Sequence, residues 1–205
     1  MKEHVLDVIN SDGKAISFDD TRKAEEYFSS LDKGREFVEG LHPTLQGALR
    51  LYAMSSFTDI NKTLRENNGK VGEEDKDLRV FDFSSMSDKH FSMDGVVDAI
   101  DATMAMCPLE DDVIVYRGFN NPRMLGFEEK EEVIDACMMG DISYTEHGYM
   151  STSAVCGGRF VNECPYVMAI RLPKGTNVCY LNNDVGLIGE VEILVQRGCE
   201  VVITG

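Results

Sequence analysis

The chain changes character near Pro108, and this division constrains its fold more than any other feature. Before Pro108, apolar residues recur at helical spacing in four stretches, about 19–31, 44–53, 58–65 and 95–106. After it, short apolar runs separated by turn residues are typical of strands, and one helix, about 128–139, interrupts them. Helices first and strands later, without regular alternation, predict an α+β fold with an antiparallel sheet.

Local signals set the boundaries of these predicted elements. Thr44 can begin the second helix after Pro43, and Thr58 or Asp59 can begin a separate, shorter helix. Residues 66–90 are polar and rich in turn residues, which predicts a long surface connection with room for one short helix. The expected strands are the short apolar runs at 5–9, 113–118, 148–153, 166–172, 177–180, 190–195 and 200–204.

Length and charge exclude several classes of protein. The 205 residues suffice for one sizeable core, and no apolar run approaches the roughly 20 residues of a membrane span. The first residues do not lead into the apolar stretch of a signal peptide, so a cytoplasmic protein is expected. The net charge of −16 argues against nucleic acid as the main partner. It suits a basic protein target, and it equally suits a chain that is merely kept soluble.

Cysteines and histidines show no metal-binding pattern. The six cysteines are spread along the chain without a Cys-x-x-Cys pair, which favours reduced, buried thiols over a disulfide framework. The four histidines are also scattered. We therefore expect no metal site, and a reducing cytoplasm as the place of action.

Two glutamates lie within one predicted strand, in the sequence Glu190-Val191-Glu192. Because side chains alternate along a strand, Val191 and Ile193 can fill a core while Glu190 and Glu192 share the other face. Their Cα atoms would lie ~7 Å apart, close enough to raise the proton affinity of at least one carboxylate. Taken alone, such a pair is more often the solvent face of an ordinary strand.

Two further strand features complement the glutamates. Arg117 shares a strand face with Val113 and Val115, and a guanidinium in that position requires an anionic partner, either a ligand phosphate or carboxylate or a structural salt bridge. In Ser151-Thr152-Ser153, alternation places the two serines opposite the threonine, so that their hydroxyls can support a carboxylate or a ribose.

Arginine, then Ser-Thr-Ser, then Glu-x-Glu, each on a strand, resembles the R-S-E class of mono-ADP-ribosyltransferases. The likeness is strongest to the bacterial exoenzyme domains, which include the actin-modifying binary toxins and the Rho-modifying exoenzymes. It extends over roughly residues 19–204, and it rests on four further stretches: Tyr52 with Ile60-Asn61 and Leu64-Arg65, Val115 to Phe119, Gly148 to Ser153, and Leu172 to Leu181.

The resemblance implies a fold with N-terminal helices packed on two roughly perpendicular antiparallel sheets. Residues 1–205 would form one catalytic domain, mainly helical over 19–107 and mainly β over 108–205, where NAD binds as a substrate and loses nicotinamide. Glu192 would be the catalytic glutamate and Ser151 would orient it. The implied NAD-binding residues are Arg117, Gly118, Ser151, Thr152, Ser153, Arg159 and Phe160, the last two in a phosphate-nicotinamide loop. The alternative for Phe160 is that it begins the next core strand.

Glu190 implies which acceptor is modified. In this class, Glu-x-Glu accompanies arginine acceptors, because a protonated guanidinium is a poor nucleophile and needs a carboxylate to take up its proton. The expected protein substrate therefore carries an accessible arginine. The implied target-recognition loop, at Val185, Gly186, Leu187 and Ile188, lacks the aromatic residue often found there, so the target stays open.

Two other functions remain compatible with the sequence. One is an NAD glycohydrolase, in which water is the acceptor, and the other is a non-catalytic module that binds NAD or a partner. The route to the target is also open, between a toxin domain carried by a delivery or activator protein, a secreted effector, and a phage enzyme that acts where it is made.

Overall fold

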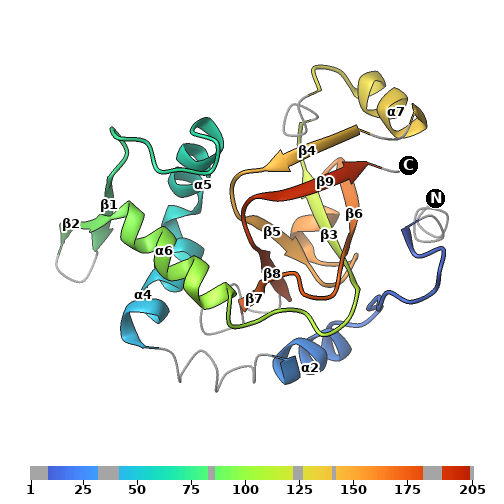
Figure 1. Cartoon of the computed structure of the whole chain (residues 1–205), viewed down its shortest axis with the longest axis horizontal. Coiled ribbons are helices and arrows are strands. Elements are labelled where there is room, and N and C mark those ends of the chain that lie inside the picture. The colour runs from blue at the N-terminus through green and yellow to red at the C-terminus, as the bar shows by residue number, and fades with distance from the viewer. Residues whose placement is uncertain are drawn as a thin grey trace.

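The helices within residues 43–66 and 93–104 lie to one side of the strands that follow Pro108 (Figure 1). The computed structural model describes residues 9–31, 42–82, 86–121, 127–139, 142–181 and 191–203. The helices before Pro108 are α2 (Thr21–Leu31), α4 (Pro43–Leu51), the π-helical turn η1 (Tyr52–Ser56), α5 (Phe57–Glu66) and α6 (Met93–Met104). Those after it are α7 (Lys130–Met139) and the single turn α8 (Arg159–Asn162).

The central sheet has five strands in the order β6-β3-β5-β8-β7, and its neighbours pair antiparallel. A second sheet pairs β4 with β9, and its strands run across those of the central sheet in Figure 1. The strands of the two sheets are β3 (Val113–Phe119), β4 (Ile142–Glu146), β5 (Met150–Ser153), β6 (Tyr166–Leu172), β7 (Val178–Leu181), β8 (Glu192–Val195) and β9 (Cys199–Ile203). The predicted α+β architecture is confirmed.

Both faces of the central sheet are covered. Leu194 of β8 points into a core shared with Leu49 of α4 and Ile100 of α6. Its neighbour Ile193 points the other way, into a core that contains Phe28 of α2. The alternation predicted for the glutamate strand thus fixes which side chains meet the helices.

The two helices predicted around Tyr52 form one continuous helical segment, and the break predicted at Thr58 is wrong. The segment runs from Pro43 to Glu66 through the π-helical turn η1, and Thr58 lies within the first turn of α5. A residue that can cap a helix does not end one where the apolar face continues, and Ile60 and Leu64 extend that face. π-Helical turns occur frequently at functional sites.

The surface connection predicted over residues 66–90 is also wrong, because it contains the antiparallel strands β1 (Asp77–Asp82) and β2 (Ser87–Ser92). Leu78 is buried against the helical core, with 1% of its surface exposed. The outer face is charged: Arg79 pairs with Asp88, and His90 Nδ1 lies 2.7 Å from Asp77 Oδ2. These cross-strand charges gave the segment its loop-like composition.

Asn61 joins the helical side to the central sheet. Its amide nitrogen donates to the Tyr52 hydroxyl at 2.8 Å, and its oxygen accepts the Tyr149 N–H at 2.8 Å. This approach leaves no room at Gly148, where an added Cβ would lie 2.8 Å from Asn61 Oδ1.

We expect Gly148→Ala to lower the free energy of unfolding by about 1–3 kcal/mol, because overpacking forces α5 away from β5. Chemical denaturation measures the loss. Gly157→Ala is the matched control, since an added Cβ at Gly157 meets nothing within 4 Å. Equal stability of the two variants would show that the helix does not depend on this contact.

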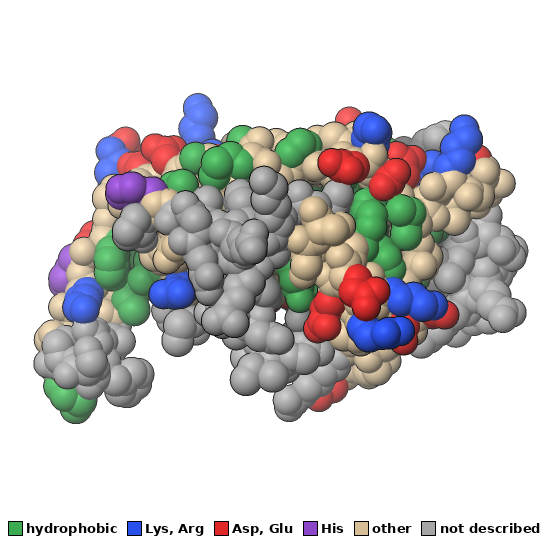
Figure 2. Space-filling model, turned by 90° about the horizontal axis from the view of Figure 1, so that it is seen from below, with side chains coloured by type: hydrophobic (Ala, Val, Ile, Leu, Met, Phe, Trp, Pro, Cys, Tyr) green, Lys and Arg blue, Asp and Glu red, His purple; other side chains and the backbone are tan. Residues whose placement is uncertain are grey.

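Acidic and basic side chains lie intermingled on the face of the molecule shown in Figure 2. Among the described residues, no helix has both the length and the apolar composition to cross a membrane. In the described part, Cys156, Cys164 and Cys199 carry free thiols.

Candidate active site

Ser151 and Glu192 meet on adjacent central strands. In the antiparallel register of β5 and β8, Ser153 lies opposite Glu192 and Ser151 opposite Leu194, so these side chains share one face. The Ser151 hydroxyl donates a hydrogen bond to Glu192 Oε1 at 2.5 Å. The pair thus joins two of the three motifs that the sequence singled out.

Burial raises the pKa of the Glu192 carboxyl above its ordinary value, and the Ser151 hydrogen bond acts in the opposite direction. A carboxylate that is withdrawn from water interacts strongly with any positive charge that develops beside it. Ser151 favours the ionised form by donating a hydrogen bond to it.

Arg117 lies on β3, one residue after Tyr116, which pairs with Ser153 of β5. The Arg117 side chain is only 14% exposed, and its Nη1 lies 3.6 Å from Glu146 Oε2. This nitrogen is buried and has no hydrogen-bond partner among the described residues. Burial lowers the pKa of Arg117, whereas Glu146 raises it. A buried guanidinium with unused N–H groups can bind a phosphate oxygen.

Glu146, at the end of β4, is the carboxylate beside Arg117. It accepts two hydrogen bonds from Arg65, at 2.8 Å from Nε and 3.2 Å from Nη2, and a third from the Gly148 N–H at 2.9 Å. Arg117 therefore meets an anion that is already bonded to another arginine, so the salt bridge expected as the alternative is present without a hydrogen bond.

Charged side chains from several of these stretches act on the hydroxyl of Tyr52. Burial raises the pKa of its hydroxyl; Glu192 raises it further, and Arg117 and Arg65 lower it. Glu192 and both guanidinium groups therefore all act electrostatically on the Tyr52 hydroxyl.

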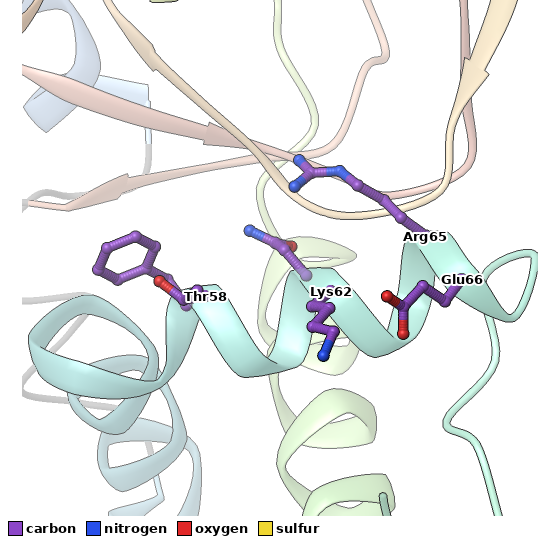
Figure 3. A pocket seen from close by; sticks show the side chains of 6 residues that line it. Thr58, Lys62, Arg65 and Glu66 are labelled. Atoms are coloured by element: carbon purple, nitrogen blue, oxygen red, sulfur yellow. The ribbon is translucent and has the colours of Figure 1, made fainter. Parts of the chain in front are cut away.

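A groove of about 410 Å³ runs along α5 beside Arg65 (Figure 3). Arg65 reaches from α5 towards the strands, whereas Lys62 points away from them. Pockets of roughly 300–1,000 Å³ hold small molecules and cofactors. The lining residues of this groove are Phe57, Thr58, Asn61, Lys62, Arg65 and Glu66.

The other predicted site residues differ in their placement. Gly118 lies in β3 next to Arg117. The Thr152 hydroxyl is buried and donates to the Ile193 carbonyl at 2.7 Å, so it holds β5 against β8. The Ser153 hydroxyl donates to the Val155 carbonyl at 2.8 Å.

The loop after Ser-Thr-Ser contains a helical turn. Arg159 and Phe160 begin α8, and the next strand starts only at Tyr166, so the alternative in which Phe160 begins that strand is wrong. Glu190 and the predicted target loop, from Val185 to Ile188, lie outside the described residues.

Comparison with known proteins identifies the family. A model of the ADP-ribosyltransferase exoenzyme family matches residues 31–205. The chain belongs to this family. The resemblance predicted from the strand motifs is confirmed, and the protein is an ADP-ribosyltransferase that uses NAD as its ADP-ribose donor.

Relatives and solved structures agree with the assignment to the exoenzyme family. The epidermal cell differentiation inhibitor of Staphylococcus aureus is 25% identical over 97% of this chain and 85% of its own. A C3-type protein of S. aureus, solved with NAD, has a TM-score of 0.70 at 22% identity and covers 91% of this chain and 88% of that one. An ADP-ribosyltransferase from Clostridium botulinum has a TM-score of 0.69 at 20% identity, over 93% of this chain and 90% of that one.

Glu146 is the residue at this site that sequence reasoning missed. It follows Ile142 and Tyr144 in an alternating pattern, which is a weak signal for a strand. Nothing in that pattern indicates that its carboxylate is buried beside two arginines. Arg65 lay within a stretch that carried the family resemblance, but no role was assigned to it.

Proposed function

We propose that this enzyme transfers ADP-ribose from NAD to an arginine side chain of a target protein. The observation that carries the proposal is the Ser151–Glu192 hydrogen bond, in which the Glu192 carboxylate is partly buried. Cleavage of the nicotinamide–ribose bond passes through an oxocarbenium-like state, as in glycosidases. Glu192 holds the ribose 2′-hydroxyl and stabilises the positive charge that develops on the sugar.

The phosphates bind at the arginine side of the site. Arg117 has unused N–H groups and Arg65 borders the α5 groove, so the two guanidinium groups clamp the pyrophosphate. Gly118, the neighbour of Arg117 in β3, and Ser153, which lies opposite Glu192, are assigned to the same NAD site, whereas Thr152 supports the strand pairing. Arg159 and Phe160 serve the phosphate and nicotinamide ends of NAD.

Glu190 acts on the acceptor. The pKa of a guanidinium is about 12 or more, so the acceptor arginine is protonated at neutral pH. A carboxylate must bind the guanidinium and remove a proton as the guanidinium attacks the ribose. Glu190 precedes Glu192 by two residues in the sequence. In this division of labour, Glu192 acts at the ribose and Glu190 at the incoming arginine.

Ser151→Ala should move the acidic limb of the pH profile to higher pH. Glu192 must be ionised, so activity is present above its pKa and lost below it. The Ser151 hydrogen bond lowers that pKa, and without it the effect of burial is unopposed. The measurement is kcat/KM for nicotinamide release between about pH 4 and pH 8, a range that brackets the ordinary glutamate pKa.

Ser153→Ala is the control for the pH profile. Its hydroxyl bonds to Val155 and not to Glu192, so the pH of the acidic limb should stay where the wild type has it. A limb that moves equally in both variants would show that Ser151 does not set the protonation of Glu192.

The proposed acceptor can be tested with three short peptides that differ only in one residue, arginine, asparagine or cysteine. Each is incubated with the enzyme and NAD, and mass spectrometry locates any added ADP-ribose. We expect modification of the arginine peptide alone. Modification of the asparagine or cysteine peptide would overturn the arginine assignment.

We further propose that residues 1–205 work as one catalytic domain and that the protein is a toxin or effector. Relatives include an ADP-ribosyltransferase toxin from Paenibacillus larvae. A protein with net charge −16 is attracted to a basic surface around the acceptor arginine. Delivery to that target can involve a partner protein.

A further inference from the structure

Glu146 is the only carboxylate-bearing residue among the described ones that is buried, with 6% of its surface exposed. Burying a carboxylate is costly unless it is paired and hydrogen-bonded. Oε1 accepts from both Arg65 Nε and the Gly148 N–H, and Oε2 accepts from Arg65 Nη2. These three bonds fix the carboxylate in one orientation.

The Glu146 carboxylate also attracts Arg117, but it does not accept a hydrogen bond from it. The 3.6 Å separation of Arg117 Nη1 from Glu146 Oε2 is too long for a hydrogen bond, but short enough for strong attraction. Arg65 and Glu146 act on Arg117 in opposite directions, since the nearby guanidinium disfavours its charge and the carboxylate favours it. The negative charge of Glu146 therefore offsets the repulsion between the two guanidinium groups. Arg117 Nη1 is left buried and without a hydrogen-bond partner among the described residues.

We propose that Glu146 is a positioning residue that holds Arg65 and Arg117 as one pyrophosphate-binding unit. This inference rests on the proposed NAD site. Two guanidinium groups against one carboxylate leave one positive charge, which faces the two negative charges of the pyrophosphate. The Glu146 carboxylate is engaged by Arg65, Arg117 and the Gly148 N–H, so it acts on the ligand only through the two arginines.

The test compares two ligands that share the site but not the phosphates. ADP carries the pyrophosphate, and nicotinamide carries no phosphate. Glu146→Gln keeps the shape of the side chain but removes the charge and places an NH₂ group against a guanidinium. We expect the dissociation constant for ADP to rise roughly 10- to 100-fold, as for other residues that orient binding groups, with nicotinamide affinity unchanged. The KM for NAD should rise by a similar factor, and kcat should fall much less.

Asp112, the residue just before β3, offers a matched control. It accepts from Arg171 Nε at 3.1 Å, from Arg171 Nη2 at 2.6 Å and from the Lys174 N–H at 2.9 Å, which repeats the pattern around Glu146. Arg171 also pairs with Asp12. Asp112→Asn should therefore change stability without changing the affinity for ADP.

Glu146→Asp keeps the charge and guards against a glutamine variant that does not fold. Its side chain is one methylene shorter, so ADP affinity should lie between those of the wild type and Glu146→Gln. Unchanged ADP affinity in both Glu146 variants, or equal loss of ADP and nicotinamide affinity, would overturn the positioning role. If the wild type binds neither ADP nor NAD, the proposed site itself is wrong, and the inference falls with it.

Discussion

Glu192→Gln is expected to lower the rate of NAD cleavage by about 100- to 1,000-fold, the loss typical when one preorganised electrostatic contact to a transition state is removed. Glutamine keeps the oxygen that accepts the Ser151 hydrogen bond, so the strand geometry is preserved. It cannot supply the negative charge that stabilises an oxocarbenium-like ribose. Nicotinamide release, followed by chromatography at saturating NAD, measures the effect.

The melting temperature of Glu192→Gln shows whether the loss of activity is caused by unfolding. Burial raises the pKa of Glu192 in the folded protein, so the ionised side chain is unfavourable for folding at pH values above that raised pKa. Replacing it with glutamine should leave the melting temperature unchanged or raise it. Glu200→Gln, at an exposed position on β9, is the control and should retain activity. Full activity of Glu192→Gln would exclude Glu192 as the catalytic carboxylate.

Glu190→Gln should separate the two halves of the reaction. Loss of the proton acceptor is expected to reduce transfer to arginine by about 10²- to 10⁴-fold, the usual contribution of general base catalysis. Cleavage of NAD with water as acceptor should continue, because Glu192 remains to stabilise the ribose. The experiment follows labelled ADP-ribose on agmatine and free nicotinamide in the same tube.

The ratio of the two products decides the role of Glu190. We expect Glu190→Gln to release nicotinamide but to form little labelled agmatine. If both products fall by the same factor, Glu190 serves NAD cleavage itself, and the division of labour between the two glutamates is incorrect.

Periodicity predicted the fold well where one face of an element is apolar. The strand at 166–172 and the alternation around Ile193 were predicted correctly, because core packing imposes a period of two on the sequence. Residues 77–92 were missed, since their strands expose cross-paired charges such as Arg79 and Asp88. Helix continuity through Tyr52 was missed because the sequence does not show that a π-helical turn keeps the apolar face in register.

The site was predictable only as far as local motifs reach. Alternation correctly placed Ser151 and Thr152 on opposite faces of β5. By contrast, Glu146 meets Arg65 across 81 residues of sequence, and no local pattern encodes that contact. Such a contact arises from the crossing of β4 over the central sheet, which depends on the whole fold.

The most direct test incubates NAD, labelled in its ADP-ribose part, with agmatine and either the wild type or Glu192→Ala. Both labelled agmatine and free nicotinamide are measured. The account predicts that the wild type forms the two products together and that the variant forms neither. Nicotinamide released by the wild type without labelled agmatine would contradict transfer to a free guanidinium and favour an NAD glycohydrolase or a transferase that lacks its target. Product formation that persists in Glu192→Ala would contradict the proposed active site.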